Sequence, residues 1–72
     1  MNEVILDVKA VSGGWWVGCD LPIEPTFYRS GARAEQMARA LAVRLSEAGH
    51  DVRLLVNDRA HQLVATQRYF GG

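Results

Sequence analysis

The chain has 72 residues and a mass of 8.0 kDa, a length that allows only one domain with a small core. Apolar residues make up 49% and charged residues 22%, a globular composition that argues against disorder, collagen and coiled coil. Eight basic residues balance eight acidic ones, so the net charge gives no reason to expect nucleic acid or an anionic membrane as a partner. Cys19 is the only cysteine, which excludes an internal disulfide and a four-thiolate zinc site.

No apolar run in the sequence is long enough for a secretory signal or a membrane-spanning helix. The N-terminal run Val4–Leu6 is interrupted by Asp7 and has no basic flank before it. We therefore expect a cytoplasmic protein without a membrane partner, in which a free thiol stays reduced.

The start of the chain has the pattern of a β-hairpin. Apolar and polar side chains alternate over residues 4–10, which indicates a half-buried strand, and the turn residues Ser12–Gly14 follow. Residues 15–19 form a second strand rich in aromatic and β-branched types. Because adjacent strand residues point to opposite faces, one of Trp15 and Trp16 must face the core and the other must face away.

A loop and a helix are expected after this hairpin. Both prolines lie in residues 20–30, which predicts a loop or an edge strand for this segment, and residues 26–28 are the candidate for a short edge strand before the helix. The apolar period then changes to 3.6, and Ser30 is the expected N-cap of a helix over residues 31–48 that ends at Gly49. The apolar stripe of this helix consists of Ala34, Met37, Ala38, Leu41, Leu45 and Ala48.

The end of the chain has the pattern of a second hairpin. Residues 52–57 and 61–69 alternate as strands, and the turn chemistry of Asn57–Ala60 joins them. We therefore expect one α+β domain over residues 1–70, followed by a flexible tail at residues 71–72. Its fold is predicted as a four-stranded, mainly antiparallel sheet in the order ββαββ, with one helix packed on one face.

One helix leaves the second face of such a sheet uncovered, and apolar residues remain in the sequence at positions of that face. An open apolar face on a small domain indicates a protein partner, most often a second copy of the chain. We therefore expect a homodimer, or a complex with an unidentified protein, formed through the open face or an edge strand. The predicted interface residues are Ile5, Val11, Trp16 and Leu55.

Three short motifs resemble a group of small uncharacterised bacterial domains built as hairpin, helix and hairpin. The motifs are Gly14–Val17, the helical segments Ala32–Glu35 and Ala38–Ala42, and a closing turn at Asp58. The resemblance implies the same architecture, and it implies no activity, because none is assigned to that group. This chain departs from the pattern at Arg59, where a glycine usually follows the aspartate.

The sequence holds little catalytic chemistry. Cys19, His50 and His61 include the residue types of a cysteine nucleophile and its base, but no nucleophile motif surrounds the cysteine. We expect Cys19 to be a small buried hydrophobe and the histidines to be solvated. Gly13–Gly14 joins two strands, so it is expected to be a hairpin turn and no phosphate loop. We therefore predict a non-enzymatic domain without catalytic residues, metal ligands or a cofactor.

Two other functions stay open. Residues 1–28 carry one lysine and four acids, a net charge of −3, whereas residues 29–72 carry seven arginines and four acids, a net charge of +3. Such a basic half, beside an exposed tryptophan, could bind single-stranded nucleic acid. The anion or nucleic-acid contacts would then be Arg29, Arg33, Arg53 and Arg59. The other alternative is a ubiquitin-like carrier, since such proteins also end in two glycines, here Gly71–Gly72.

Overall fold

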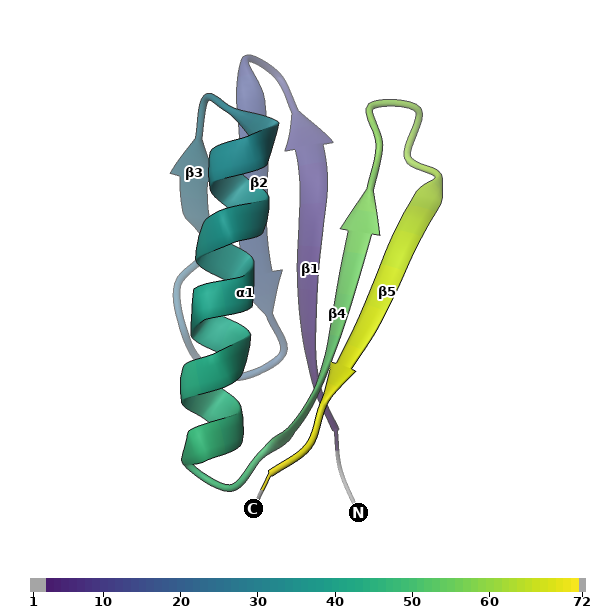
Figure 1. Cartoon of the computed structure of the whole chain (residues 1–72). Coiled ribbons are helices and arrows are strands. Elements are labelled where there is room, and N and C mark those ends of the chain that lie inside the picture. The colour runs from purple at the N-terminus through teal and green to yellow at the C-terminus, as the bar shows by residue number, and fades with distance from the viewer. Residues whose placement is uncertain (1–2, 72) are drawn as a thin grey trace.

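One α-helix covers one face of a five-stranded sheet in residues 3–71, the part of the chain that the computed structural model describes (Figure 1). The sheet order is β3-β2-β1-β4-β5, so the fold is α+β. β1 and β4 are parallel, and the other neighbouring strands are antiparallel. The elements in chain order are β1 (Glu3–Val11), β2 (Gly14–Cys19), β3 (Thr26–Tyr28), α1 (Gly31–Glu47), β4 (Asp51–Asn57) and β5 (Leu63–Tyr69).

The predicted four-stranded, mainly antiparallel sheet is wrong, because the structure contains a five-stranded mixed sheet. Residues 26–28 form a true fifth strand, and this strand occupies the outer edge of β2. The 17 residues of α1 span about 25 Å, enough to return the chain to the end of the sheet where β1 begins. β4 therefore runs in the same direction as β1 and pairs with its free side, which makes the central pair parallel.

A stripe of alanines on α1 lets the helix lie close to the sheet. Ala34, Ala38 and Ala42 are each fully buried, and they face large apolar side chains of the strands. Ala42 replaces Ala48 in the predicted stripe, since Ala48 is exposed and caps the end of the helix. The buried strand residues are Val4, Leu6, Val8, Ala10, Val17, Val52, Leu54 and Val56. Burial thus alternates along β1 and β4, as the period of two predicts.

The predicted ends of the helix are confirmed to within one residue. The Ser30 hydroxyl accepts a hydrogen bond from the Arg33 amide at 3.2 Å, so Ser30 is the N-cap. The helix ends at Glu47 and Gly49 follows with a φ of 101°, the left-handed conformation that a glycine adopts without strain.

The tryptophan pair divides between the two faces of the sheet. Trp15 packs against the core beneath the first residue of α1, whereas Trp16 faces away from the helix and is 41% exposed. A side chain at Gly31 would put its Cβ 2.9 Å from Cε2 of the Trp15 indole, so only a glycine fits there. The expectation of one inward and one outward tryptophan is therefore confirmed.

Candidate functional site: the open face and the β5 edge

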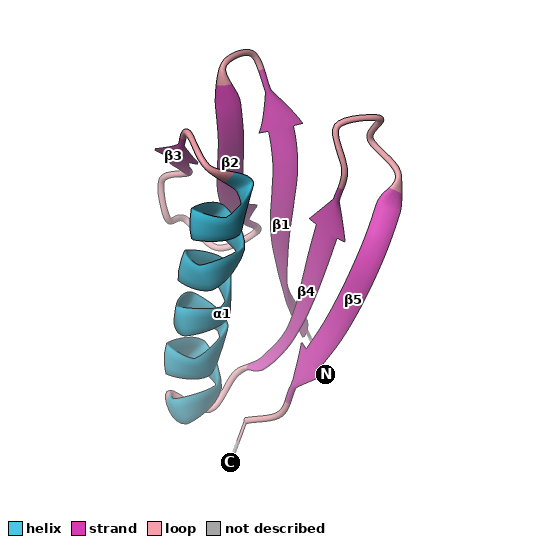
Figure 2. Cartoon of the chain, turned by 45° about the horizontal axis from the view of Figure 1, so that its top comes forward, coloured by secondary structure: helices cyan, strands magenta, loops and turns pink. Residues whose placement is uncertain are grey.

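The face of the sheet opposite α1 carries an aromatic end and a polar centre. Trp16 lies between Lys9 of β1 and Phe27 of β3, and Phe27 is 49% exposed. Further along β1, Asp7 lies beside Gly18 of β2 on one side and Leu55 of β4 on the other. No helix of residues 3–71 covers this face, so these side chains meet solvent directly (Figure 2).

All four predicted interface residues have the outward parity of this face. Ile5, Val11 and Leu55 are half-buried, and Trp16 is exposed. Charged residues separate them, since Ile5 lies beside Arg53 and Leu55 lies beside Asp7. Sequence reasoning missed Phe27 because its outward parity depends on the pairing of β3 with β2.

Charged and hydrogen-bonded groups lie on the open face, from the end where β1 begins to the middle of that strand. The Glu3 carboxylate lies 3.2 Å from Arg53 and 3.2 Å from Arg68, bridging β1 to β4 and β5. The Asn57 side-chain amide donates to Oδ1 of Asp7 at 2.7 Å and to the carbonyl of Val8 at 3.1 Å. A partner that covered these groups would have to desolvate charged side chains, which costs several kcal/mol for each ion.

The two edges of the sheet differ in how they are protected. β3 has only three residues and follows a loop that contains Pro22 and Pro25, two features that discourage pairing with another chain. β5 has seven residues without proline or lysine, and six of them are exposed. Its outer edge has no pairing strand among residues 3–71, and α1 lies mainly over the other strands (Figure 2). The edge of β5 therefore lacks proline, lysine and a covering helix, and its protection is limited to Arg68 and the irregular pairing with β4 near Asn57.

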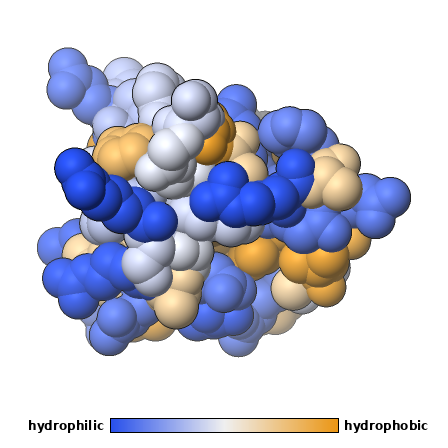
Figure 3. Space-filling model, turned by 90° about the horizontal axis from the view of Figure 1, so that it is seen from above, coloured by the Kyte–Doolittle hydropathy of each residue, from blue (hydrophilic) through white to orange (hydrophobic). Residues whose placement is uncertain are grey.

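The four predicted anion-binding arginines do not form one site. Arg29 and Arg33 are exposed at the start of α1, and the Arg59 guanidinium lies over the Trp15 ring, 4.9 Å from its centroid. Arg53 is on the open face, where it pairs with Glu3. Figure 3 looks onto the end of the molecule where α1 begins, and its most hydrophilic side chains lie dispersed among paler ones.

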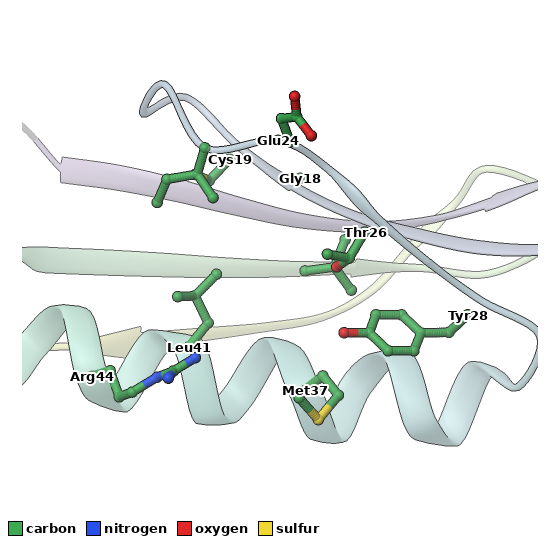
Figure 4. Close-up of a pocket in the computed structure, with 10 residues that line it drawn as sticks. Gly18, Cys19, Glu24, Thr26, Tyr28, Met37, Leu41 and Arg44 are labelled. Carbon is green, nitrogen blue, oxygen red and sulfur yellow. The ribbon is translucent and has the colours of Figure 1, made fainter.

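A small cavity of about 160 Å³ lies between α1 and the loop that follows β2, and it contains the only thiol (Figure 4). Cys19 is half-buried, and its Sγ lies 3.8 Å from the carbonyl of Leu21. The labelled side chains of Met37, Leu41 and Tyr28 make the cavity largely apolar. No histidine lines it, so the cavity offers the thiol no imidazole base.

The other candidate reactive residues do not form a site. His50 and His61 are both exposed, and no cluster of His, Cys, Asp or Glu in residues 3–71 could hold a metal ion. The Gly71 amide donates to Oδ1 of Asp51 at 3.0 Å, and the Gly71 backbone packs against Gly49. The carrier hypothesis also needs Gly72, which lies outside the described residues.

Comparisons of the chain with protein-family models, with curated proteins and with solved structures found no match. The resemblance to hairpin–helix–hairpin bacterial domains therefore stays a prediction. In the described residues, no helix is both long and apolar enough to cross a membrane. The function proposed below therefore rests on the arrangement of the residues in this structure.

Proposed function

We propose that this chain is a non-enzymatic binding domain of the cytoplasm that forms a homodimer by antiparallel pairing of two β5 strands. The observation that carries the proposal is the exposed edge of β5, a seven-residue strand with six exposed residues. Alternate residues of an antiparallel edge strand point their amide and carbonyl groups outward, where a second strand can bond to them. A natural domain normally blocks such an edge with proline, lysine or a covering element, and β5 has none of these among residues 3–71.

The sequence of β5 supports pairing with a second copy of itself. A two-fold axis through Thr66 aligns Ala65–Gln67, the regular centre of β5, with the same segment of the other copy, so that Ala65 lies opposite the partner's Gln67. Beyond Ala65 the strand shifts register against β4, because Ala65 pairs with Val56 and Leu63 pairs with Asn57, so Leu63 and Tyr69 lie on opposite faces of the sheet. The only charge of the strand, Arg68, avoids its symmetry mate in this register and stays bonded to Glu3.

The composition of the open face favours a dimer contact at the β5 edge rather than at the open face. A face-to-face dimer would bury the ion pairs of Glu3 with Arg53 and Arg68, and the desolvation of buried ion pairs can exceed the attraction between them. Edge pairing leaves these charges in water and adds main-chain hydrogen bonds. The apolar residues of the open face then remain available for another ligand.

Sedimentation equilibrium of matched variants tests this proposal. Val64 is 60% exposed on β5, and Val43 is 44% exposed on α1, so the same change can be made at both places. Val64→Lys should weaken the dimer at least about tenfold, because a lysine on an edge strand opposes strand pairing. Val43→Lys should leave the dimer constant unchanged.

Two further outcomes would contradict the proposal. A wild-type chain that remains an 8.0 kDa species at high concentration would show that β5 does not pair. If Leu55→Asp or Ile5→Asp dissociated the dimer and Val64→Lys did not, the dimer contact would lie on the open face. Far-ultraviolet circular dichroism of each variant establishes that its helix and sheet are intact.

A further inference from the structure

The open face contains a hollow over β1 and β2, which extends from Trp16 to the loop after β2, and β4 separates it from β5. The hollow has a volume of about 350 Å³, the size of site that binds small organic molecules. Trp16 and Ile5 supply apolar walls, and the loop after β2 closes the outer side with Pro25. Gly18 forms part of the floor.

The hollow exists because Gly18 has no side chain. Gly18 has the same outward parity as Trp16 and lies directly beside Asp7. A Cβ built at this position would meet nothing nearer than the Cβ of Pro25, at 3.9 Å. The backbone there is not in the left-handed region, so neither strain nor crowding requires a glycine. A side chain at this position would therefore meet no obstacle at its Cβ and would reduce the volume of the hollow.

Two fixed carboxylates give the hollow its chemistry. Oδ1 of Asp7 accepts from the Asn57 side chain at 2.7 Å, and Oδ1 of Asp20 accepts from the Ile5 amide at 3.0 Å. In both residues Oδ2 accepts no hydrogen bond from residues 3–71, so it is available to a ligand. Hydrogen bonds thus orient two negative groups beside an exposed indole.

We propose that this hollow binds a small organic cation, an alkylammonium or guanidinium group that carries apolar carbons. The positive charge is attracted by Asp7 and Asp20, and the face of the Trp16 indole adds a cation–π interaction. Ile5 packs against the apolar part. An anion is disfavoured, because the two carboxylates outnumber the one cation, Lys9, that lines the hollow.

Lys9 makes the proposal more specific. It lies across from Trp16, is exposed and makes no ion pair with residues 3–71. Its ammonium repels a bound cation, so Lys9→Gln should tighten binding. If the hollow were an anion site, the same substitution would weaken binding.

Titration followed by nuclear magnetic resonance tests the site on the ¹⁵N-labelled full chain. The probes are phenyltrimethylammonium and benzenesulfonate, two soluble aromatic ions of opposite charge. The indole N–H signal of Trp16, assigned with Trp16→Phe, should shift saturably with the cation and remain fixed with the anion. The Trp15 indole, which packs on the core side, is the internal reference.

Substitutions at the floor and at the charges give the decisive comparison. Gly18→Val should abolish the shift, and Asp7→Asn or Asp20→Asn should each weaken binding about tenfold, as the loss of one charged contact predicts. Val11→Ile, on the same face but outside the hollow, should bind like the wild type. A urea midpoint unchanged in Gly18→Val separates filling of the hollow from loss of the fold.

Any of three results would overturn the inference. The Trp16 signal does not shift saturably with the cation, it shifts equally with the anion, or Gly18→Val binds the cation as well as the wild type. Val64→Lys should retain the cation site even where it dissociates the dimer, because no β5 residue lines the hollow. Sedimentation therefore tests the proposed dimer, and the cation titration tests the proposed site independently of it.

Discussion

Adjacent leucines on β4 provide a direct test of which face of the sheet α1 covers. Leu54 is 1% exposed in the core, whereas Leu55 is half-buried on the open face. Truncation of a buried leucine to alanine costs about 2–5 kcal/mol, from lost burial and from the cavity left behind. At about 0.05–0.15 kcal/mol per residue, the 72-residue chain has a total stability of about 4–11 kcal/mol. Leu54→Ala should therefore remove a large part of the stability.

Leu55→Ala is the matched control, and it should cost only about 1 kcal/mol, the typical effect of a point substitution. Urea unfolding of both variants at one protein concentration measures the difference. For a slope of about 1–3 kcal/mol per molar urea, the loss of about 2–5 kcal/mol in Leu54→Ala should lower the midpoint by about 0.7–5 M, and Leu55→Ala should lower it by much less. Equal losses, or a larger loss in Leu55→Ala, would show that the helix does not cover the face we describe.

Three further substitutions test local features. Gly31→Ala should alter the near-ultraviolet circular dichroism of Trp15 and cost about 1–3 kcal/mol, since the new Cβ meets the indole; an unchanged spectrum would contradict this packing. Ser30→Ala should lower the free energy of unfolding by about 1 kcal/mol, measured in urea, because the Arg33 amide loses its acceptor. His61→Gly should raise the urea midpoint, because His61 has a φ of 61°, in the left-handed region, which costs residues other than glycine about 1–2 kcal/mol. This relief is larger than the entropy cost of ordering a glycine. A lower midpoint would show that His61 is not strained.

Local pattern determined most of the secondary structure of this chain. The N-cap at Ser30 and the stop at Gly49 were predictable because each satisfies helix-end groups through a residue type suited to that task. The alternation along β1 and β4 predicted the buried set, because a strand with one covered face must place its apolar residues at every second position. The inward Trp15 could not be chosen over Trp16 until the register was known.

Strand pairing was the part that local pattern could not determine. The alternating pattern of β4 indicates that one of its faces is buried. It does not determine whether the strand beside β4 is β1 or β2. The neighbour follows from the length of α1 and from the three residues of β3, which occupy the edge of β2. The same limit applies to the candidate site. The hollow joins residues of β1, β2 and the following loop, and no spacing in the sequence marks Gly18 as its floor.

The geometry of the closing turn explains why Arg59, in place of a glycine after Asp58, does not break the second hairpin. Oδ1 of Asp58 accepts from the amides of Ala60 and Gln62, at 2.8 Å and 3.0 Å, and backbone hydrogen bonds of Asp58 with Gln62 and His61 also close the turn. The left-handed position falls on His61, three residues after the aspartate. A glycine directly after Asp58 is therefore not needed in this turn.

The two proposed surfaces have a geometric consequence when they are taken together. Antiparallel pairing of two β5 strands places the two-fold axis perpendicular to the sheet, so both copies present their open face on the same side. The two hollows then open in one direction, and in each copy β4 separates the hollow over β1 and β2 from the dimer contact. Because the surfaces share no residue, a single cation should bind monomer and dimer equally well. A ligand with two linked cations would gain affinity only from the dimer, and only if its linker spans the distance between the hollows.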